Sequence, residues 1–184
     1  MHRNAHRALA ATAAAVPRLV CLIWITLSTV SVDAYADAGH GHGHGAQSGM
    51  GAPGSVADAS RTIDVTMTEY GYDPSSISVR ADETVRFVLR NRGRLVHEFN
   101  IGTPQAHEAH QAEMLEMLQS GHLSQTEIHS HGKTAHVHAN SVLLAPGESE
   151  ELVWRFGSDV AGLEFACNVP GHYQAGMVGR FTRD

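Results

Sequence analysis

Alternation of apolar and polar residues along short segments is the feature that most restricts the fold of this chain. Ile63, Val65 and Met67 alternate with polar residues, and residues 85–89 repeat the pattern further along. A period of two places successive side chains on opposite faces of a β-strand, and turn residues at short spacing separate such segments here. The pattern predicts an all-β protein of seven or eight strands, arranged as a sandwich or a barrel.

Residues 103–140 interrupt this pattern with a long insertion. Thr103 followed by Pro104 is typical of a helix start, because threonine can cap the first turn and proline is tolerated at its first position. The stretch Pro104–Gln119 is rich in alanine, glutamate, glutamine, methionine and leucine, which favours a helix. Residues 120–140 are polar and contain five histidines, and we interpret them as a loop. An insertion of this length inside a compact domain usually has a function.

The start of the chain, residues 1–36, has the composition of a secretion signal peptide. Its first half carries three arginines and no acidic residue, and the apolar run Leu19–Val32 that follows is short for a membrane span. Because Ala34 and Ala36 are small residues that suit a signal peptidase, we expect cleavage after Ala36 and export to the periplasm, with no stable membrane insertion afterwards. Cleavage after Ala34 or Ala38, or an uncleaved anchor, are the alternatives.

Residues 37–60 consist largely of glycine, alanine and serine, and His40, His42 and His44 alternate with glycine. Such a composition cannot fill a core, so we predict a flexible His/Gly-rich tail, in which weak chelation of a metal ion by the histidines is plausible. The remaining residues, 61–184, are predicted to form one domain that contains the insertion.

Charge and histidine content narrow the classes of function. The chain has a net charge of -6, which argues against nucleic acid as a partner because phosphate binding needs a cationic surface. Its 14 histidines outnumber its 13 lysines and arginines, and such an excess indicates metal binding or pH sensing. After cleavage Cys167 is the sole cysteine, so it is a free thiol, an intermolecular bridge or a metal ligand.

Three residues that bind soft metals follow the predicted strand Gly162–Ala166. Cys167, His172 and Met177 have the spacing Cys-x4-His-x4-Met, and this set selects copper over calcium or magnesium, while the methionine argues against zinc. A blue-copper site needs two histidines and one cysteine in a plane, with a weak axial methionine. His97, in a strand-like segment just after a turn, is the best candidate for the second histidine. The alternative is that Cys167 is a buried structural thiol.

The strand order, His97 and the Cys167–Met177 loop resemble the cupredoxins, the family of plastocyanin, azurin and rusticyanin. More closely, the segments His97–Gly102 and Asn140–Leu144, the insertion and the Cys-Asn-Val-Pro-Gly-His sequence resemble the periplasmic copper-tolerance cupredoxins of CopI type. The resemblance implies a Greek-key β-sandwich over residues 61–184, with a His/Met-rich helix and loop inserted. It also implies one type 1 copper, used in copper handling or electron transfer. The ligands that it implies are His97, Cys167, His172 and Met177.

Further histidines and methionines lie outside this ligand set. On a helix that begins at Pro104, the spacing of four of them puts all four within one face, where they could bind Cu(I), or Cu(II) through the histidine pair. The alternative is an ordinary packing face. The candidate accessory copper ligands are His107, His110, Met114 and Met117, together with His40, His42 and His44 of the tail.

We therefore expect an exported monomer that binds one redox-active type 1 copper and acts in copper tolerance or homeostasis. The alternative is an electron carrier between periplasmic or membrane redox partners, in which case a redox protein is the partner. An enzyme is not expected, because Ala166 and Asn168, which flank Cys167, are not the histidines that would connect it to a trinuclear copper cluster. Oxidation of Cu(I) by the protein is a third hypothesis.

Overall fold

The computed structural model describes residues 49–129 and 138–184. The predicted signal peptide and most of the predicted tail, with His40, His42 and His44, lie outside the described residues. Within the described residues the chain forms a β-sandwich of ten strands, with one α-helix and one short 3-10 helix. None of the helices in this part of the chain is long and apolar enough to cross a membrane.

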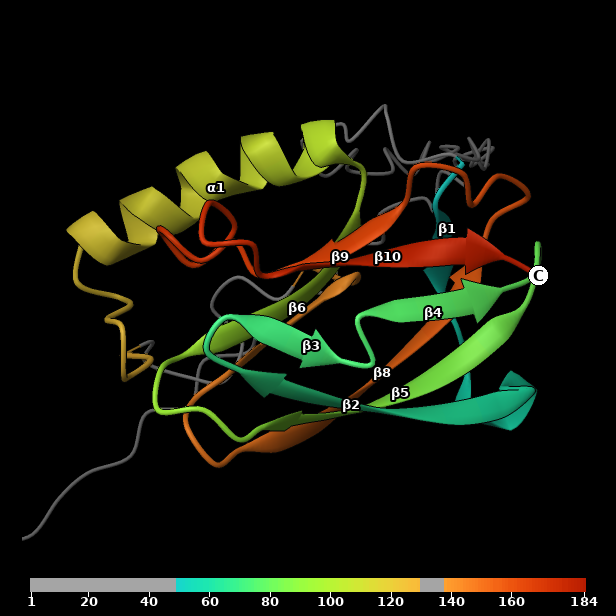
Figure 1. The fold of residues 1–184 in the computed structure, drawn as a ribbon, viewed down its shortest axis with the longest axis horizontal. Helices are drawn as coiled ribbons and strands as arrows, with labels where there is room; N and C mark the ends of the chain where they lie inside the picture. Colours follow the sequence, from blue (N-terminus) through green and yellow to red (C-terminus); the bar gives the residue numbers. More distant parts are fainter. Residues whose placement is uncertain (1–48, 130–137) are drawn as a thin grey trace, which may run out of the picture. The chain divides into compact units, whose positions relative to one another are not determined.

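The strands form two five-stranded sheets that face each other (Figure 1). The first sheet has the order β1 (Gly51–Pro53), β8 (Ser149–Phe156), β5 (Thr84–Asn91), β2 (Arg61–Thr68) and β3 (Gly71–Asp73). The second has the order β4 (Ser76–Val79), β10 (Val178–Arg183), β9 (Glu164–Ala166), β6 (His97–Gly102) and β7 (Ser141–Leu144). Neighbours are antiparallel, except that β2 pairs with β5 and β4 with β10 in parallel. Strands far apart in the sequence are neighbours, as the predicted Greek-key sandwich requires.

The alternation in the sequence corresponds to the inner faces of the sheets. Val85, Phe87 and Leu89 of β5 are fully buried, and the residues between them are only partly buried. Phe87 of the first sheet lies 5.3 Å, between ring centroids, from Phe99 of the second, so aromatic rings join the two layers. Burial of these apolar side chains, at about 25 cal/mol per Å², is the main force that holds the sheets together.

The structure differs from the sequence prediction at the start of the domain. A flexible tail was predicted through residue 60, but β1 and the 3-10 helix η1 (Val56–Asp58) lie in that stretch. Met50 is 3% exposed, and its carbonyl accepts a hydrogen bond from the Trp154 indole nitrogen at 3.1 Å. The tail prediction is therefore wrong from Gly51 onward, because the contacts that order this segment come from β8 at the other end of the sequence. The count of seven or eight strands is low because β1 and β3 are three-residue strands, too short to show alternation.

Helix α1 (Pro104–Gln119) has the predicted bounds, and the Thr103 side chain caps it by accepting a hydrogen bond from the Ala106 N–H at 3.2 Å. The Gln174 side-chain amide donates to the Gln111 side chain at 2.7 Å, so α1 lies beside the loop that joins β9 to β10, as Figure 1 shows. The insertion therefore lies against the segment that carries three of the four predicted copper ligands.

Strand β6 positions the candidate site, since all six of its residues are buried. Asn100 of β6 lies opposite Ala166 of β9 in an antiparallel pair. Because antiparallel neighbours run past each other, Cys167, the residue after β9, lies beside the start of β6. His97 is the first residue of that strand, so the sheet register brings these two predicted ligands together.

Candidate metal centre

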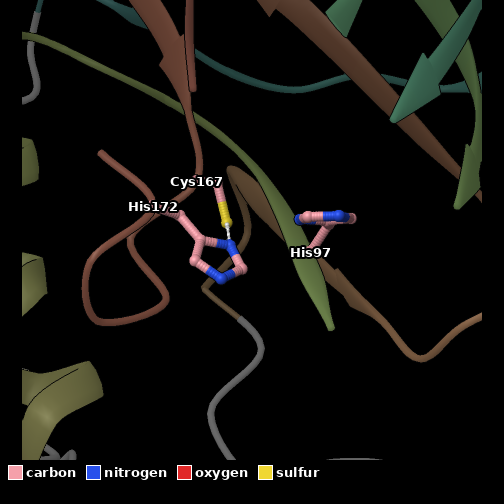
Figure 2. A group of neighbouring side chains, drawn as sticks. All are labelled: His97, Cys167 and His172. Atoms are coloured by element: carbon pink, nitrogen blue, oxygen red, sulfur yellow. Dashed lines mark hydrogen bonds between the residues drawn. The ribbon is translucent and has the colours of Figure 1, made fainter. Parts of the chain in front are cut away.

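Three of the four predicted copper ligands meet in the interior of the sandwich. His97 begins β6, Cys167 follows β9 directly, and His172 lies on the loop between β9 and β10. One ligand atom of each lies within 4.8 Å of the other two, and the residues are 0%, 0% and 2% exposed. Figure 2 shows the cluster, with Nδ1 of His172 facing the Cys167 sulfur at 3.3 Å. A single metal ion could contact all three side chains.

Met177, the fourth predicted ligand, is fully buried at the end of the same loop. The Met177 N–H donates to the His172 carbonyl at 3.0 Å, and the Met177 carbonyl accepts a hydrogen bond from the Cys167 N–H at 3.2 Å. The His172 N–H donates in turn to the Val169 carbonyl at 2.9 Å. These backbone hydrogen bonds fold the loop back on itself, so that the three ligand-bearing residues keep a fixed spacing.

The surroundings of His97 fit a metal ion. Both of its ring nitrogens are buried and have no hydrogen-bond partner among the described residues, and the nearest carboxylate oxygen, from Glu69, lies 3.6 Å from Nε2. A buried polar atom without a partner costs about 1–3 kcal/mol, so such atoms are rare unless something else satisfies them. A metal ion on this imidazole would supply the missing partner. The set of two imidazoles, a thiolate and a thioether is the set that suits copper.

In the copper-free protein at neutral pH, the two imidazoles are in the protonation state that binds a metal, whereas the thiol is not. Burial lowers the pKa of His97, and burial together with the charge of His97 lowers the pKa of His172 to about 4. Both rings are therefore neutral at pH 7 and can donate a lone pair to a metal. Burial raises the pKa of the Cys167 thiol well above its usual range, so copper must displace the thiol proton when it binds.

Two further contacts hold the ligands in place. The backbone N–H of Glu98 donates to the Cys167 sulfur at 3.3 Å, an interaction that stabilises the thiolate. Nε2 of His172 donates to the side-chain oxygen of Gln125 at 3.1 Å, so Nδ1 is the ring nitrogen that would bind a metal ion. Gln125 belongs to the insertion, and the Val96 N–H donates to its carbonyl at 2.7 Å. The insertion is therefore part of the site, a role for Gln125 that the sequence did not reveal.

The side chain of Glu98 is the centre of a buried polar network next to the ligands, and no local pattern in the sequence indicates this role. Glu98 is 2% exposed. Its carboxylate accepts hydrogen bonds from the Asn168 N–H at 3.1 Å, from the Asn168 side chain at 2.8 Å, from His110 at 2.9 Å and from the Ser141 hydroxyl. Burial alone would raise the pKa of Glu98, but these partners lower it to about 2. The network joins the residues next to His97 and Cys167 to helix α1.

The four predicted accessory ligands on α1 lie on one buried face, as their spacing indicated. Met114 and Met117 belong to the hydrophobic core. His107 contacts the Asn168 side chain, with 3.3 Å between Nδ1 and Nδ2, whereas His110 contacts Glu98 and Glu113. The helix face therefore packs against the sandwich, and copper binding by these four residues remains a prediction.

The protonation of His110 should link the stability of the copper-free protein to pH. Burial lowers the pKa of this imidazole, but the carboxylates of Glu98 and Glu113 outweigh burial and raise it from 6.5 to about 9. A pKa that is higher in the folded state stabilises the protein fully below pH 6.5, and this stabilisation is lost as the pH rises through 9. Between about pH 6 and about pH 9.5, we expect the free energy of unfolding to fall by roughly 1–3 kcal/mol more in the wild type than in His110→Gln.

Urea denaturation of both proteins at the two pH values measures this difference. His122→Gln is the matched control, because His122 is an exposed histidine on the loop that follows α1. The control should keep the pH dependence of the wild type. An unchanged pH dependence in His110→Gln would contradict the assignment.

The chain is similar to proteins of known family. A family model described as a cupredoxin-like domain matches residues 20–130. A copper-resistant cuproprotein CopI from Pseudomonas aeruginosa is 46% identical over 147 residues, which cover 72% of this chain and 81% of that protein. A copper-resistant cuproprotein CopI from Rubrivivax gelatinosus is 39% identical over 169 residues, 89% of this chain and 93% of that protein.

A comparison of structures supports the fold. Auracyanin B superposes with a TM-score of 0.53 over 74% of this chain and 96% of its own, at 20% sequence identity. At that identity the likeness concerns the fold alone, which agrees with the two-sheet sandwich described above. The fold, the buried His97–Cys167–His172 cluster and the two close relatives lead to one conclusion: the chain belongs to the cupredoxin-like family, and within it to the CopI cuproproteins.

Proposed function

We propose that this protein binds one type 1 copper ion and protects the cell against copper. The observation that carries the proposal is the buried cluster of His97, Cys167 and His172, in which neither ring nitrogen of His97 has a hydrogen-bond partner within residues 49–129 and 138–184. The two relatives described as copper-resistant cuproproteins support the role in resistance. When bound, the metal supplies a one-electron change of oxidation state, and no substrate needs to enter the interior.

The protein's own residues hold and shield the ion. His97, Cys167 and His172 would supply two neutral imidazoles and a thiolate to the ion, and the buried thioether of Met177 would be the fourth, weaker ligand. The Glu98 N–H supports the negative sulfur, and Gln125 fixes the ring of His172. Because these contacts exist before copper binds, little of the binding free energy is needed to order the site.

Burial of the ligands favours copper binding over the alternative role as an electron carrier. His172 is 2% exposed, Gln125 hydrogen-bonds its outer nitrogen, and the Tyr70 ring lies 5.0 Å from its ring centroid. A docking redox protein would meet these residues rather than an exposed copper ligand. An insertion that covers the site fits a protein that retains copper better than one that exchanges electrons rapidly with a partner.

Export is part of the proposal. A secretion signal over residues 1–36 would carry the chain to the periplasm, so the protein would bind its copper there and not in the cytoplasm. We infer that the mature protein acts there as a monomer. Oxidation of Cu(I) is a secondary activity that the one-electron site would permit, with the electron passed on to an external acceptor.

Copper tolerance of a strain that lacks the gene tests the proposed function. Complementation with the wild type should restore growth in copper, and Cys167→Ser, expressed at equal abundance, should not restore it. His129→Ala is the matched control, since His129 is 46% exposed in the insertion and lies away from the cluster. The carrier hypothesis makes the opposite prediction: respiration without added copper would fall on deletion, and copper tolerance would stay normal.

A further inference from the structure

A second group of possible metal ligands lies outside the copper cluster. It consists of His110 and Glu113 on α1 and His138 before β7, and one ligand atom of each lies within 4.8 Å of the other two. Nδ1 of His110 is 2.7 Å from a Glu113 carboxylate oxygen, and Nε2 of His138 is 3.1 Å from the same oxygen. The two imidazole rings are 4.9 Å apart at their centroids and nearly perpendicular. Two nitrogens and one oxygen therefore converge on one point.

The cluster is reachable from solvent on one side and supported on the other. The side chains of Glu113 and His138 are 52% and 31% exposed, whereas that of His110 is 10% exposed. An ion can therefore arrive from solvent and meet a ligand that the protein holds in place. The copper cluster differs in this respect, since its three residues are all buried.

His110 is held in the orientation that a metal ligand requires. Its Nε2 donates to the buried Glu98 carboxylate at 2.9 Å, so Nδ1 is the nitrogen that points to Glu113 and His138. Histidines that bind metals commonly donate their other ring N–H to a carboxylate, which fixes the ring and strengthens the lone pair on the ligating nitrogen. Glu98 supplies that support here without being a ligand itself.

The donor set defines the class of ion. Two imidazoles and a carboxylate suit divalent first-row transition ions, and among these Cu²⁺ binds most strongly. The set contains no sulfur, so it does not suit Cu(I), which prefers thiolate and thioether ligands. This site would therefore bind copper as Cu²⁺ rather than as Cu(I).

We propose that His110, Glu113 and His138 form a second metal site that binds a divalent transition-metal ion, and that it binds Cu²⁺ more tightly than the other ions of this class. The metal bonds to Nδ1 of His110, to a Glu113 carboxylate oxygen and to Nε2 of His138. The proton on Nδ1 of His110 is released to solvent as the metal–nitrogen bond forms, and the Nε2–H continues to donate to Glu98. The proton that Nε2 of His138 directs at Glu113 is exchanged through solvent for one on Nδ1 of the same ring, so that Nε2 offers its lone pair to the metal. The ion keeps its oxidation state, so no other reactant is needed.

Titration of the full chain with Cu²⁺ tests the proposal, in a background in which His40, His42 and His44 are alanine. The first equivalent should give the thiolate-to-copper band. The second should give an electron paramagnetic resonance signal of copper with nitrogen ligands and add nothing to that band. In His138→Ala and in Glu113→Ala the affinity for the second equivalent should fall at least about tenfold, because loss of a ligand costs no less than loss of a supporting contact. The first band should be unchanged, which shows that the variants fold.

His129→Ala is the matched control, because His129 is also an insertion histidine but pairs with Glu127 rather than with this cluster. It should bind the second equivalent as the wild type does. The proposal is overturned if no second Cu²⁺ binds, if both variants bind it with wild-type affinity, or if His129→Ala weakens it equally. If the thiolate band is absent while the second signal depends on His138 and Glu113, the proposed type 1 site fails and this inference stands.

Discussion

Replacement of Cys167 by serine is expected to abolish the intense thiolate-to-copper absorption of the loaded protein and to weaken copper binding by more than about tenfold. Cys167 is the only thiol among the described residues and lies 3.3 Å from Nδ1 of His172. A serine hydroxyl does not ionise at neutral pH and is a harder donor, so the soft anionic ligand of the cluster is lost. Visible absorption during a copper titration, followed by metal analysis after dialysis, measures both effects.

Met177→Leu is the matched control for Cys167→Ser. Leucine keeps the apolar volume of this fully buried side chain and removes only the thioether. Because an axial methionine binds weakly, the variant should keep the thiolate band, although the band can change in position. A strong band in Cys167→Ser would show that the chromophore is not the Cys167 thiolate and would refute the type 1 site.

Local patterns in the sequence were enough to predict the parts of the fold that local interactions determine. The alternation around Val65 and Phe87 predicted strands, and both residues are fully buried between the sheets. Thr103 and Pro104 predicted where α1 begins, because an N-cap and a proline act within one turn of the helix. The spacing of Cys167 and His172 predicted that they act together, since both lie on one short loop.

Contacts between distant segments could not be predicted in this way. Strand β1 exists because Met50 and Gly51 meet Trp154 and Arg155 of β8, and nothing near Gly51 in the sequence indicates that partner. The burial of Glu98 is a similar case. In a strand with one solvent-exposed face a glutamate would point outward, but both faces of β6 are covered, so an acidic residue lies in the interior. Its partners come from α1, from β7 and from the residue after Cys167.

The second large effect is expected from Glu98→Ala, which should lower the free energy of unfolding of the copper-free protein by about 3–5 kcal/mol at neutral pH. The substitution leaves the protonated ring of His110 without its buried carboxylate and leaves the Asn168 and Ser141 donors without an acceptor. The loss of one member of a buried charged pair is costly, because the remaining charge stays away from water. Urea denaturation monitored by tryptophan fluorescence measures the change.

Glu113→Ala is the matched control, because Glu113 pairs with the same imidazole at 2.7 Å but its side chain is 52% exposed. Water can replace an exposed partner, so this variant should lose less than about 1 kcal/mol. Equal losses in Glu98→Ala and Glu113→Ala would contradict the network, since Glu98 differs from Glu113 in its burial and in the hydrogen bonds that it accepts from Asn168 and Ser141.

Glu98→Gln separates the charge of this carboxylate from its hydrogen bonds. Glutamine keeps the volume and one acceptor oxygen, but its amide group directs N–H donors toward the donors of Asn168 or His110. Its loss of stability should therefore lie between those of Glu113→Ala and Glu98→Ala. The backbone N–H of residue 98 still donates to the Cys167 sulfur in this variant, so the thiolate band should remain. A Glu98→Gln protein that is folded yet lacks the band would mean that the Glu98 charge, acting through Asn168, sets the position of Cys167, and that the copper ligands depend on the network directly.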